Sequence, residues 1–255
     1  MKTSVSIITA VYNGASILSE CLNSVNSQTI SVEHLVIDGA STDSTLEMVR
    51  QQSPQSKIYS ESDFGIYDAM NKGIKIASGE IIGILNADDF YASPDVIAKV
   101  VKVFENPEID ACYGNLLYVA ETLSQYTSLF KTIRYWKSGS FKPARFYWGW
   151  MPPHPTFFVR RRIYDKYGLF NLSLGSAADY ELMLRFLLKH KIRTAYIPEI
   201  LVKMRTGGAS NANLNNRILA NKMDRKAWDV NGLKPYPWTL LFKPLRKIPQ
   251  WFAKP

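Results

Sequence analysis

The sequence predicts an α/β protein with a mainly parallel central sheet flanked by helices and a more mixed C-terminal region. In the first third of the chain, short apolar runs alternate with segments whose apolar residues recur at helical spacing. A second observation is the continuous apolar run at residues 81–85, which is typical of a parallel strand buried on both faces. After that run the pattern becomes more aromatic and less regular.

The expected elements of the first half follow in order. Strands are expected at residues 5–8, 34–38, 57–59 and 81–85. Helices are expected at residues 17–25, 42–49, 66–77 and 93–104. The first helix has Cys21, Leu22 and Val25 on one face, and Thr42 or Asp43 can cap the second. Gly79 ends the third helix, and a Ser-Pro pair opens the fourth.

The second half is expected to add a strand and a helix, then two short strands and a last helix. These lie at residues 156–159, 178–189, 193–197, 201–204 and 215–230. After Gly232 the pattern dissolves into a proline-rich tail, here residues 232–255.

Length and composition exclude several classes of protein. The chain has 255 residues, 46% hydrophobic and 21% charged, so disorder, collagen and small disulfide scaffolds are excluded. No apolar run approaches the roughly 18 residues of a spanning helix, and the first ten residues do not resemble a signal peptide. A cytosolic protein is expected, with Cys21 and Cys112 as buried thiols.

The net charge of +9 is unevenly distributed. Residues 1–189 hold 18 Lys and Arg against 19 Asp and Glu, whereas residues 190–255 hold 13 against 3. The tail interleaves cations with tryptophan, leucine and phenylalanine, a composition that suits a membrane interface. Packing over the domain, disorder and binding of single-stranded nucleic acid are the alternatives.

Polar residues follow the predicted strands, where a parallel sheet binds its ligands. They are Thr9, Tyr12 and Asn13 after the first strand, Asp38 after the second, Asp63 after the third, and Asn86, Asp88 and Asp89 after the fourth. The three-glycine dinucleotide fingerprint and the P-loop are both missing, which disfavours a dehydrogenase or a P-loop enzyme. Nucleotide binding by other means stays open.

Two neighbouring carboxylates at a strand end repel each other unless a cation is present. Asp88 and Asp89 therefore predict a Mg²⁺ or Mn²⁺ site completed by phosphate oxygens, and an Asx turn is the alternative. Asp38 is favoured as a ligand contact and Asp43 as a helix cap. Asp179 alone reads as a helix N-terminal charge, and His154, between prolines, as either a structural residue or a ligand contact.

Taken together, five segments resemble the family 2 glycosyltransferases, which have the GT-A fold. They are VSIITAVYN (5–13), VIDGASTD (36–43), SESDFGIYDAMNKG (60–73), GEIIGILNADD (79–89) and ADYEL (178–182). In order, they cover roughly residues 4–205, and jointly they are specific.

The resemblance implies a nucleotide-diphosphate sugar donor bound by Thr9, Tyr12, Asp38, Asp63 and Asp88. It implies a metal site at Asp88 and Asp89, with Mn²⁺ or Mg²⁺ as cofactor, and Asp179 as the catalytic base. His154, Glu181 and Arg205 are further candidates for contacts to the acceptor or diphosphate.

Two departures from the family pattern are Asn86 at the first acidic position of the DXD-like motif and Ala178 before the base. The Gln-x-x-Arg-Trp motif of processive synthases is also absent, so addition of one sugar per encounter is expected.

The expected function is inverting, metal-dependent transfer of one sugar to a saccharide acceptor, lipid-linked, in surface polysaccharide assembly. Residues 1–115 would bind the donor, residues 116–231 would bind the acceptor and carry the base, and the tail would hold the protein at the inner face of the membrane. The alternatives are an inactive sugar-nucleotide-binding protein and nucleic-acid binding through the tail, the latter disfavoured by the acidic crevice.

Overall fold

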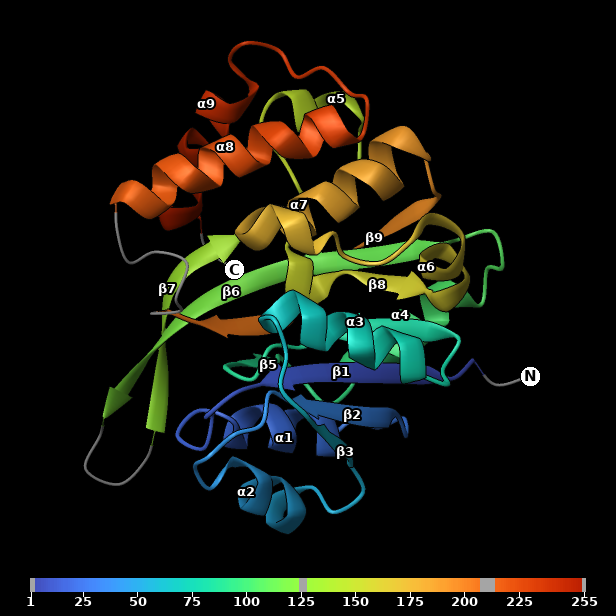
Figure 1. Cartoon of the computed structure of the whole chain (residues 1–255), viewed down its shortest axis with the longest axis vertical. Coiled ribbons are helices and arrows are strands. Elements are labelled where there is room, and N and C mark those ends of the chain that lie inside the picture. Colours follow the sequence, from blue (N-terminus) through green and yellow to red (C-terminus); the bar gives the residue numbers. More distant parts are fainter. Residues whose placement is uncertain (1–2, 124–127, 207–213, 254–255) are drawn as a thin grey trace.

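The computed structural model describes residues 3–123, 128–206 and 214–253 (Figure 1). The strands of these segments form one nine-stranded sheet in the order β3-β2-β1-β4-β8-β6-β9-β5, with β7 paired to β6. Helices cover both faces of the sheet (Figure 1). The α/β class is confirmed, with a parallel first half and a mixed second half as predicted.

The first half of the sheet has the predicted parallel strands. They are β1 (Val5–Val11), β2 (Glu33–Asp38), β3 (Lys57–Ser60) and β4 (Ile81–Ile84). Along β1, Ile8 and Ala10 belong to one core cluster and Ile7 and Val11 to the other. Both faces of the strand are therefore buried, which explains why its residues are apolar.

The second half contains a long hairpin that the sequence analysis did not predict. The remaining strands of the sheet are β5 (Asp89–Tyr91), β6 (Ala111–Leu123), β7 (Ser128–Trp136), β8 (Phe158–Arg160) and β9 (Thr194–Arg205). The hairpin consists of β6 and β7. The two short strands expected at 193–197 and 201–204 are one continuous strand, β9, which runs parallel to β6. Strand β7 runs antiparallel to β6 and extends the sheet beyond β8.

The helices follow most of the expected ranges. They are α1 (Ser19–Asn26), α2 (Thr45–Gln52), α3 (Ile66–Ile76), α4 (Val96–Phe104), α5 (Ala144–Tyr147), α6 (Arg161–Tyr167), α7 (Ala178–Met183), α8 (Leu214–Val230) and α9 (Thr239–Leu245). Short 3-10 turns lie at η1 (His154–Thr156), η2 (Leu172–Ala177) and η5 (Pro249–Trp251), and α7 continues into a π-helical turn, η3 (Leu184–Lys189). Cys21 and Cys112 are free and buried, as expected.

A three-residue strand, β8, joins the two halves of the sheet. Val159 pairs with Ile82 of β4 on one side and with Ala111 of β6 on the other. The next residue, Arg160, is buried, forms an ion pair with Glu80 and donates to the carbonyl oxygens of Phe104, Asn106 and Ile109. One guanidinium therefore ties together the segments that precede β4 and β6.

The tail packs on the domain through α9. Thr239 donates to the carbonyl oxygen of Tyr147 at 2.7 Å, and the Lys243 ammonium lies 2.7 Å from both carboxylate oxygens of Asp224. Gly149 has a φ of +73°, and a Cβ there would lie 2.4 Å from the backbone nitrogen of Lys243, so only glycine permits this close approach of the two backbones. In the described residues no helix is long and apolar enough to cross a membrane.

His34, in β2, generates a prediction about pH. Its ring is buried between the Thr9 hydroxyl, 3.1 Å from Nε2, and the Ser56 hydroxyl, 2.7 Å from Nδ1. Burial lowers the pKa of His34 to about 4. The unfolded chain therefore takes up this proton near pH 6.5 and the folded chain only near pH 4.

Because of this one group, the free energy of unfolding should fall by about 3 kcal/mol as the pH is lowered from about 6.5 to about 4. In His34→Gln, urea unfolding should depend less on pH across that window. His190→Gln, which changes a half-buried ring stacked on Tyr167, is the control and should keep most of the dependence. Equal pH dependence in the wild type and His34→Gln would contradict the assignment.

Candidate functional site

The carboxyl ends of β1, β2 and β3 meet at one edge of the sheet. Asp38, the last residue of β2, is fully buried, and its Oδ2 accepts hydrogen bonds from the Ser41 amide at 3.0 Å and the Ser60 hydroxyl at 2.6 Å. Its Oδ1 is buried and has no hydrogen-bond partner among the residues that the structure describes. A buried acceptor without a donor is costly, so this oxygen marks a place for a ligand N–H or O–H.

Tyr12 and Asp63 lie beside Asp38 at this edge. The Gly39 amide donates to the Val11 carbonyl, which brings the loops after β1 and β2 together. A Cβ on Gly39 would lie 2.7 Å from Asp63 Oδ2 and 3.5 Å from Tyr12 Cβ, so both side chains border this glycine. The ring of Tyr12 is exposed, as a stacking surface must be.

Thr9 is the first correction. Its side chain is fully buried, and its hydroxyl lies 3.1 Å from His34 Nε2 and 3.7 Å from Cys21 Sγ. Thr9 shares a face of β1 with Ile7 and Val11, which packs in the core cluster that includes helix α1. Its hydroxyl therefore supports the fold and is not available to a nucleoside.

The Asn86–Asp89 turn follows β4 at the same edge. The Asn86 side-chain amide donates to Asp89 Oδ2 at 2.9 Å, and the Asp89 amide donates to the Asn86 carbonyl at 3.0 Å. Asn86 therefore orients Asp89, a role that an aspartate at this position could not fill by donation. Asn86 Oδ1 and Asp89 Oδ1 are both buried, and neither has a hydrogen-bond partner in the described part of the chain.

The two carboxyl groups carry unfavourable negative charge. Burial, and then the charge of Asp88, raise the pKa of Asp89 well above its ordinary value, and burial also raises the pKa of Asp88. A divalent cation would reverse both effects. Two carboxylates with an amide oxygen fit Mg²⁺ or Mn²⁺, which takes its remaining ligands from water and phosphate. Among the described residues no group of three His, Cys, Asp or Glu side chains forms a metal cluster, so such a cation would need these outside ligands.

Arg205, at the end of β9, lies close to this carboxylate pair. Its charge lowers the pKa of Asp88 and of Asp89 against the larger effect of burial. The guanidinium forms ion pairs with Glu20 at 2.5 Å and Glu121 at 3.6 Å. Arg205 thus balances charge beside the site, but its own charge is already engaged by two carboxylates.

Asp179, the second residue of α7, lies on the other wall of the site. Its Oδ1 accepts from the Tyr180 amide at 2.7 Å. Burial and then the nearby Asp179 charge raise the pKa of Tyr67. Burial lowers the pKa of His154, and the nearby Asp179 partly opposes that effect. The structure therefore brings Asp179 and His154 together and adds Tyr67, which the sequence analysis did not single out.

Glu181 is the second correction. Its carboxylate is buried and accepts from Arg185 Nε at 2.8 Å, Arg185 Nη2 at 2.9 Å and Asn231 Nδ2 at 3.1 Å. Arg185 also donates to the carbonyl oxygens of Tyr167 and Leu169. Glu181 is therefore fully engaged in holding α7 to its neighbours and does not contact a substrate.

Tyr118, in β6, connects the two walls. Burial raises the pKa of Tyr118, and the charges of both Asp89 and Asp179 raise it further. The Arg134 guanidinium of β7 lies 3.7 Å from the Tyr118 ring centroid and opposes this shift. The charges of Asp89 and Asp179 thus act on one phenol. Tyr118 and Arg134 carry no sequence signal, because their position depends on how β6 and β7 pair.

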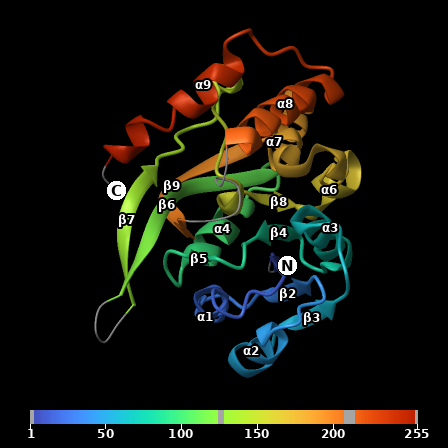
Figure 2. The ribbon, with the colours of Figure 1, turned by 60° about the vertical axis from the view of Figure 1, so that its left-hand side comes forward.

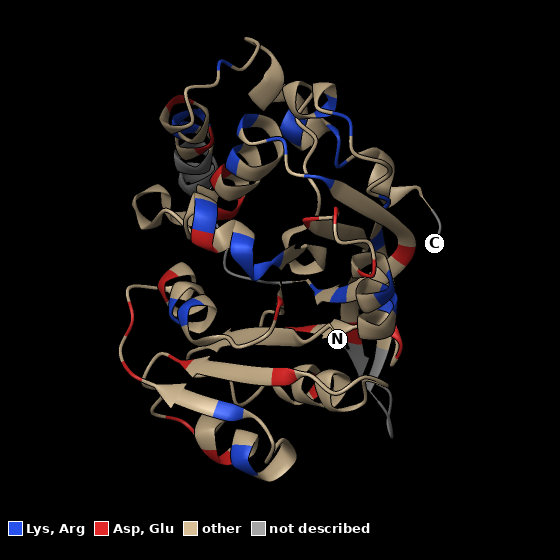
Figure 3. Cartoon of the chain, turned by 90° about the vertical axis from the view of Figure 1, so that its right-hand side faces the viewer, with Lys and Arg blue, Asp and Glu red and all other residues tan. Residues whose placement is uncertain are grey.

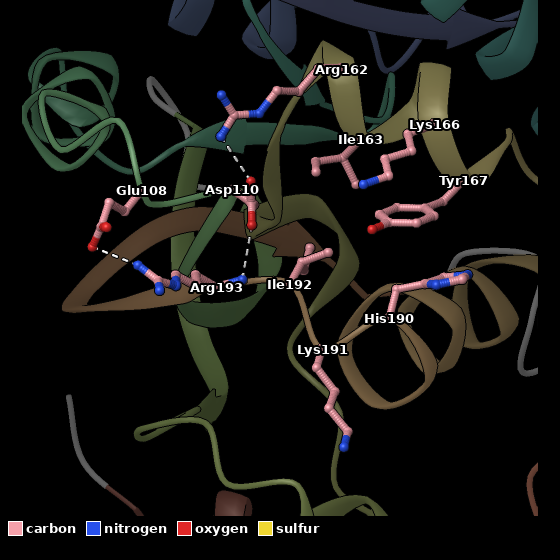
Figure 4. A pocket seen from close by; sticks show the side chains of 10 residues that line it. All are labelled: Glu108, Asp110, Arg162, Ile163, Lys166, Tyr167, His190, Lys191, Ile192 and Arg193. Carbon is pink, nitrogen blue, oxygen red and sulfur yellow. Dashed lines mark hydrogen bonds and ion pairs between the residues drawn. The ribbon is translucent and has the colours of Figure 1, made fainter.

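A separate cavity of about 450 Å³ lies near the starts of β6 and β9, away from the strand ends that carry the candidate residues (Figure 4). Its acids are paired, Asp110 with Arg162 at 2.9 Å and Glu108 with Arg193 at 2.5 Å. None of the residues predicted for the site lines this cavity.

Lys and Arg are most frequent in the half of the molecule built from the C-terminal elements (Figure 3).

The chain is similar in sequence to two mycobacterial glycosyltransferases. A PGL/p-HBAD biosynthesis glycosyltransferase of Mycobacterium tuberculosis is 28% identical over 221 residues, or 84% of this chain and 82% of the relative. An uncharacterized glycosyltransferase of the same species is 31% identical over 186 residues, or 71% of this chain and 68% of the relative.

Two solved structures share the fold. Staphylococcus aureus TarS in complex with UDP-GlcNAc has a TM-score of 0.67 at 17% identity and covers 87% of this chain, which spans 65% of that one. The mannosyltransferase PcManGT from Pyrobaculum calidifontis, in complex with GDP-Man and Mn²⁺, has a TM-score of 0.65 at 20% identity. The match covers 95% of this chain and 68% of the mannosyltransferase. The expected GT-A fold is thereby confirmed.

The family model described as glycosyl transferase family 2 matches residues 6–168, more than half of the chain. That match includes the strand ends and the carboxylate pair described above. The chain therefore belongs to glycosyl transferase family 2.

Proposed function

We propose that this glycosyltransferase moves one sugar from a nucleotide-diphosphate sugar to a hydroxyl of a saccharide acceptor, with inversion at the anomeric carbon. The observation that carries the proposal is that the charges of Asp89 and Asp179, which come from different elements, both act on the Tyr118 phenol and raise its pKa beyond the larger effect of burial. Residues 1–115 would bind the donor, and residues 116–231 would bind the acceptor and supply the base. The nucleotide sugars in the two similar structures support the class of donor.

Donor binding follows from the strand-end residues. The free Oδ1 of Asp38 would accept from the nucleobase or ribose, with Tyr12 and Asp63 beside it. Asp88, Asp89 and Asn86 would hold Mn²⁺ or Mg²⁺, which when bound neutralises negative charge on the diphosphate.

Asp179 would perform the proton transfer. Its carboxylate would take the proton of the acceptor hydroxyl as that oxygen forms a bond to the anomeric carbon. The bond from that carbon to the diphosphate oxygen breaks on the opposite face, so the configuration inverts. The hydrogen bond from the Tyr180 amide would hold the carboxylate in place. His154, whose ring packs edge-on to Phe170 at 5.6 Å, would line the acceptor side.

We further propose a lipid-linked acceptor in surface polysaccharide assembly, met at the inner face of the cell membrane by the tail. Five apolar side chains of the described tail are more than half exposed: Leu241, Leu245, Ile248, Trp251 and Phe252. Arg246 and Lys247 lie among them. Exposed apolar groups interleaved with cations match the chemistry of an anionic lipid surface.

The role of Asp179 is tested by Asp179→Asn. Turnover should fall by about 10²-fold or more, because the amide cannot accept the proton, while donor binding is retained. Asp229→Asn, which changes an exposed carboxylate of α8, is the matched control. An unchanged rate would exclude Asp179 as the base, and donor binding without any transfer or hydrolysis in the wild type would favour an inactive binding protein.

The carboxylate pair is tested by nucleotide binding with and without Mn²⁺. A nucleoside diphosphate at 100 times its Kd should stabilise the wild type by about 2.7 kcal/mol, measured as a thermal shift. In Asp89→Asn the Mn²⁺-dependent part of the shift should disappear, whereas Asp165→Asn, in α6, should keep it. A full Mn²⁺ effect in Asp89→Asn would rule out this metal site.

The tail is tested by sedimentation with anionic liposomes. The double variant Leu241→Gln, Phe252→Gln should bind at least about tenfold more weakly, because two apolar side chains no longer enter the interface. Leu172→Gln removes an exposed leucine elsewhere and should bind as the wild type does. Equal binding by all three proteins would reject membrane contact through the tail.

A further inference from the structure

Arg134, in β7, is a buried cation with an unusual environment. Its side chain is only 9% exposed, and its guanidinium stacks on the Tyr118 ring at 3.7 Å. Among the described residues no carboxylate forms an ion pair with it. A charge that is removed from water without a counter-charge is unfavourable, so this position favours an anion that the chain itself does not supply.

Three other largely buried arginines show the contrast. Arg160 pairs with Glu80, Arg185 with Glu181, and Arg205 with Glu20. Each of these guanidinium groups has a carboxylate from the same chain. Arg134 therefore departs from the pattern by which this protein buries its other arginines.

The register of the sheet places Arg134 relative to the metal site. Asp89 pairs with Met204, Met204 with Tyr118, and Tyr118 with Arg134, so the four residues form one row across β5, β9, β6 and β7. Cross-strand partners share a face of the sheet. Three strand spacings separate the backbones of Asp89 and Arg134 by about 14 Å. Arg134 thus lies on the same face as the donor-diphosphate site but at a distance from it.

The tail lies on the other side of Arg134. The Trp251 ring centroid is 5.9 Å from the guanidinium, and η5 packs against β7 (Figure 2). Arg134 is therefore between Tyr118, whose pKa the charges of Asp89 and Asp179 both raise, and the segment that carries the exposed apolar groups.

We propose that Arg134 binds a phosphate group of the acceptor. This inference rests on the proposed function, because it assumes a donor at Asp88 and Asp89 and a base at Asp179. A planar guanidinium that is held on an aromatic ring can bind a phosphate through two parallel N–H donors. An acceptor that carries phosphate beyond its reacting sugar would place the anion here and its hydroxyl at Asp179.

The test measures phosphate binding with the donor site already filled. Wild type, Arg134→Gln, Arg134→Lys and Lys131→Gln are saturated with the nucleoside diphosphate that binds and Mn²⁺, then titrated with glucose 1-phosphate, inorganic phosphate or uncharged methyl glucoside. Lys131 is an exposed cation of the same strand and serves as the matched control. Binding is followed by thermal shift.

Both phosphate probes should bind the wild type and Lys131→Gln, and methyl glucoside should bind neither. Arg134→Gln should bind phosphate at least about tenfold more weakly, with Arg134→Lys between them. Without ligand, Arg134→Met should be at least as stable as the wild type, whereas a purely structural arginine would lose stability on this change.

Equal phosphate binding by Arg134→Gln would overturn the inference. Loss of nucleotide binding in that variant would also overturn it, since Arg134 would then contact the donor. If the wild type bound no nucleotide, the proposed function would fail, and the same phosphate titrations without nucleotide would still decide the role of Arg134.

Discussion

The guanidinium of Arg160 holds together the two halves on which every other feature depends. Strand β8 is only three residues long, yet it is the junction between the parallel strands and the β6–β9 pair. The ion pair to Glu80 and the three carbonyl contacts fix the segments on either side of that junction. The carboxylate pair after β4 and the proposed base Asp179 on α7 are thereby held in fixed positions relative to each other.

The candidate site is built from unsatisfied groups. Within the described segments, Asp38, Asn86 and Asp89 each present a buried oxygen without a donor, and Arg134 presents a buried charge without a carboxylate. Each of them costs folding free energy in the ligand-free protein. Groups that stabilise only the fold, such as Glu181 and Thr9, are by contrast fully hydrogen-bonded. The candidate donor and metal residues thus differ from Glu181 and Thr9 in keeping a buried oxygen open to a ligand.

The strand ends could be predicted from the sequence, because apolar runs mark parallel strands and ligands meet their carboxyl ends. Side-chain direction was harder to predict. Thr9 lies between Ile7 and Val11 on the face of β1 that packs with α1, so its burial could be predicted from the alternation of the strand. Glu181 stands four residues before Arg185, so their ion pair could be predicted from helical spacing. Arg134 had none, since its pairing with Tyr118 depends on the hairpin register and on a bulge at Tyr118.

The docking of α9 means that the tail is not a detachable module. The Lys243 ammonium is held by Asp224 and lies 3.8 Å from the ring centroid of Tyr180, the residue next to Asp179. Shortening the chain at Gly232 would leave the Asp224 carboxylate without the Lys243 cation and uncover the Tyr180 ring next to Asp179. Loss of activity in a truncated enzyme could thus come from a disturbed α7 as well as from the missing segment. Point substitutions on the outer face of the tail separate the two effects.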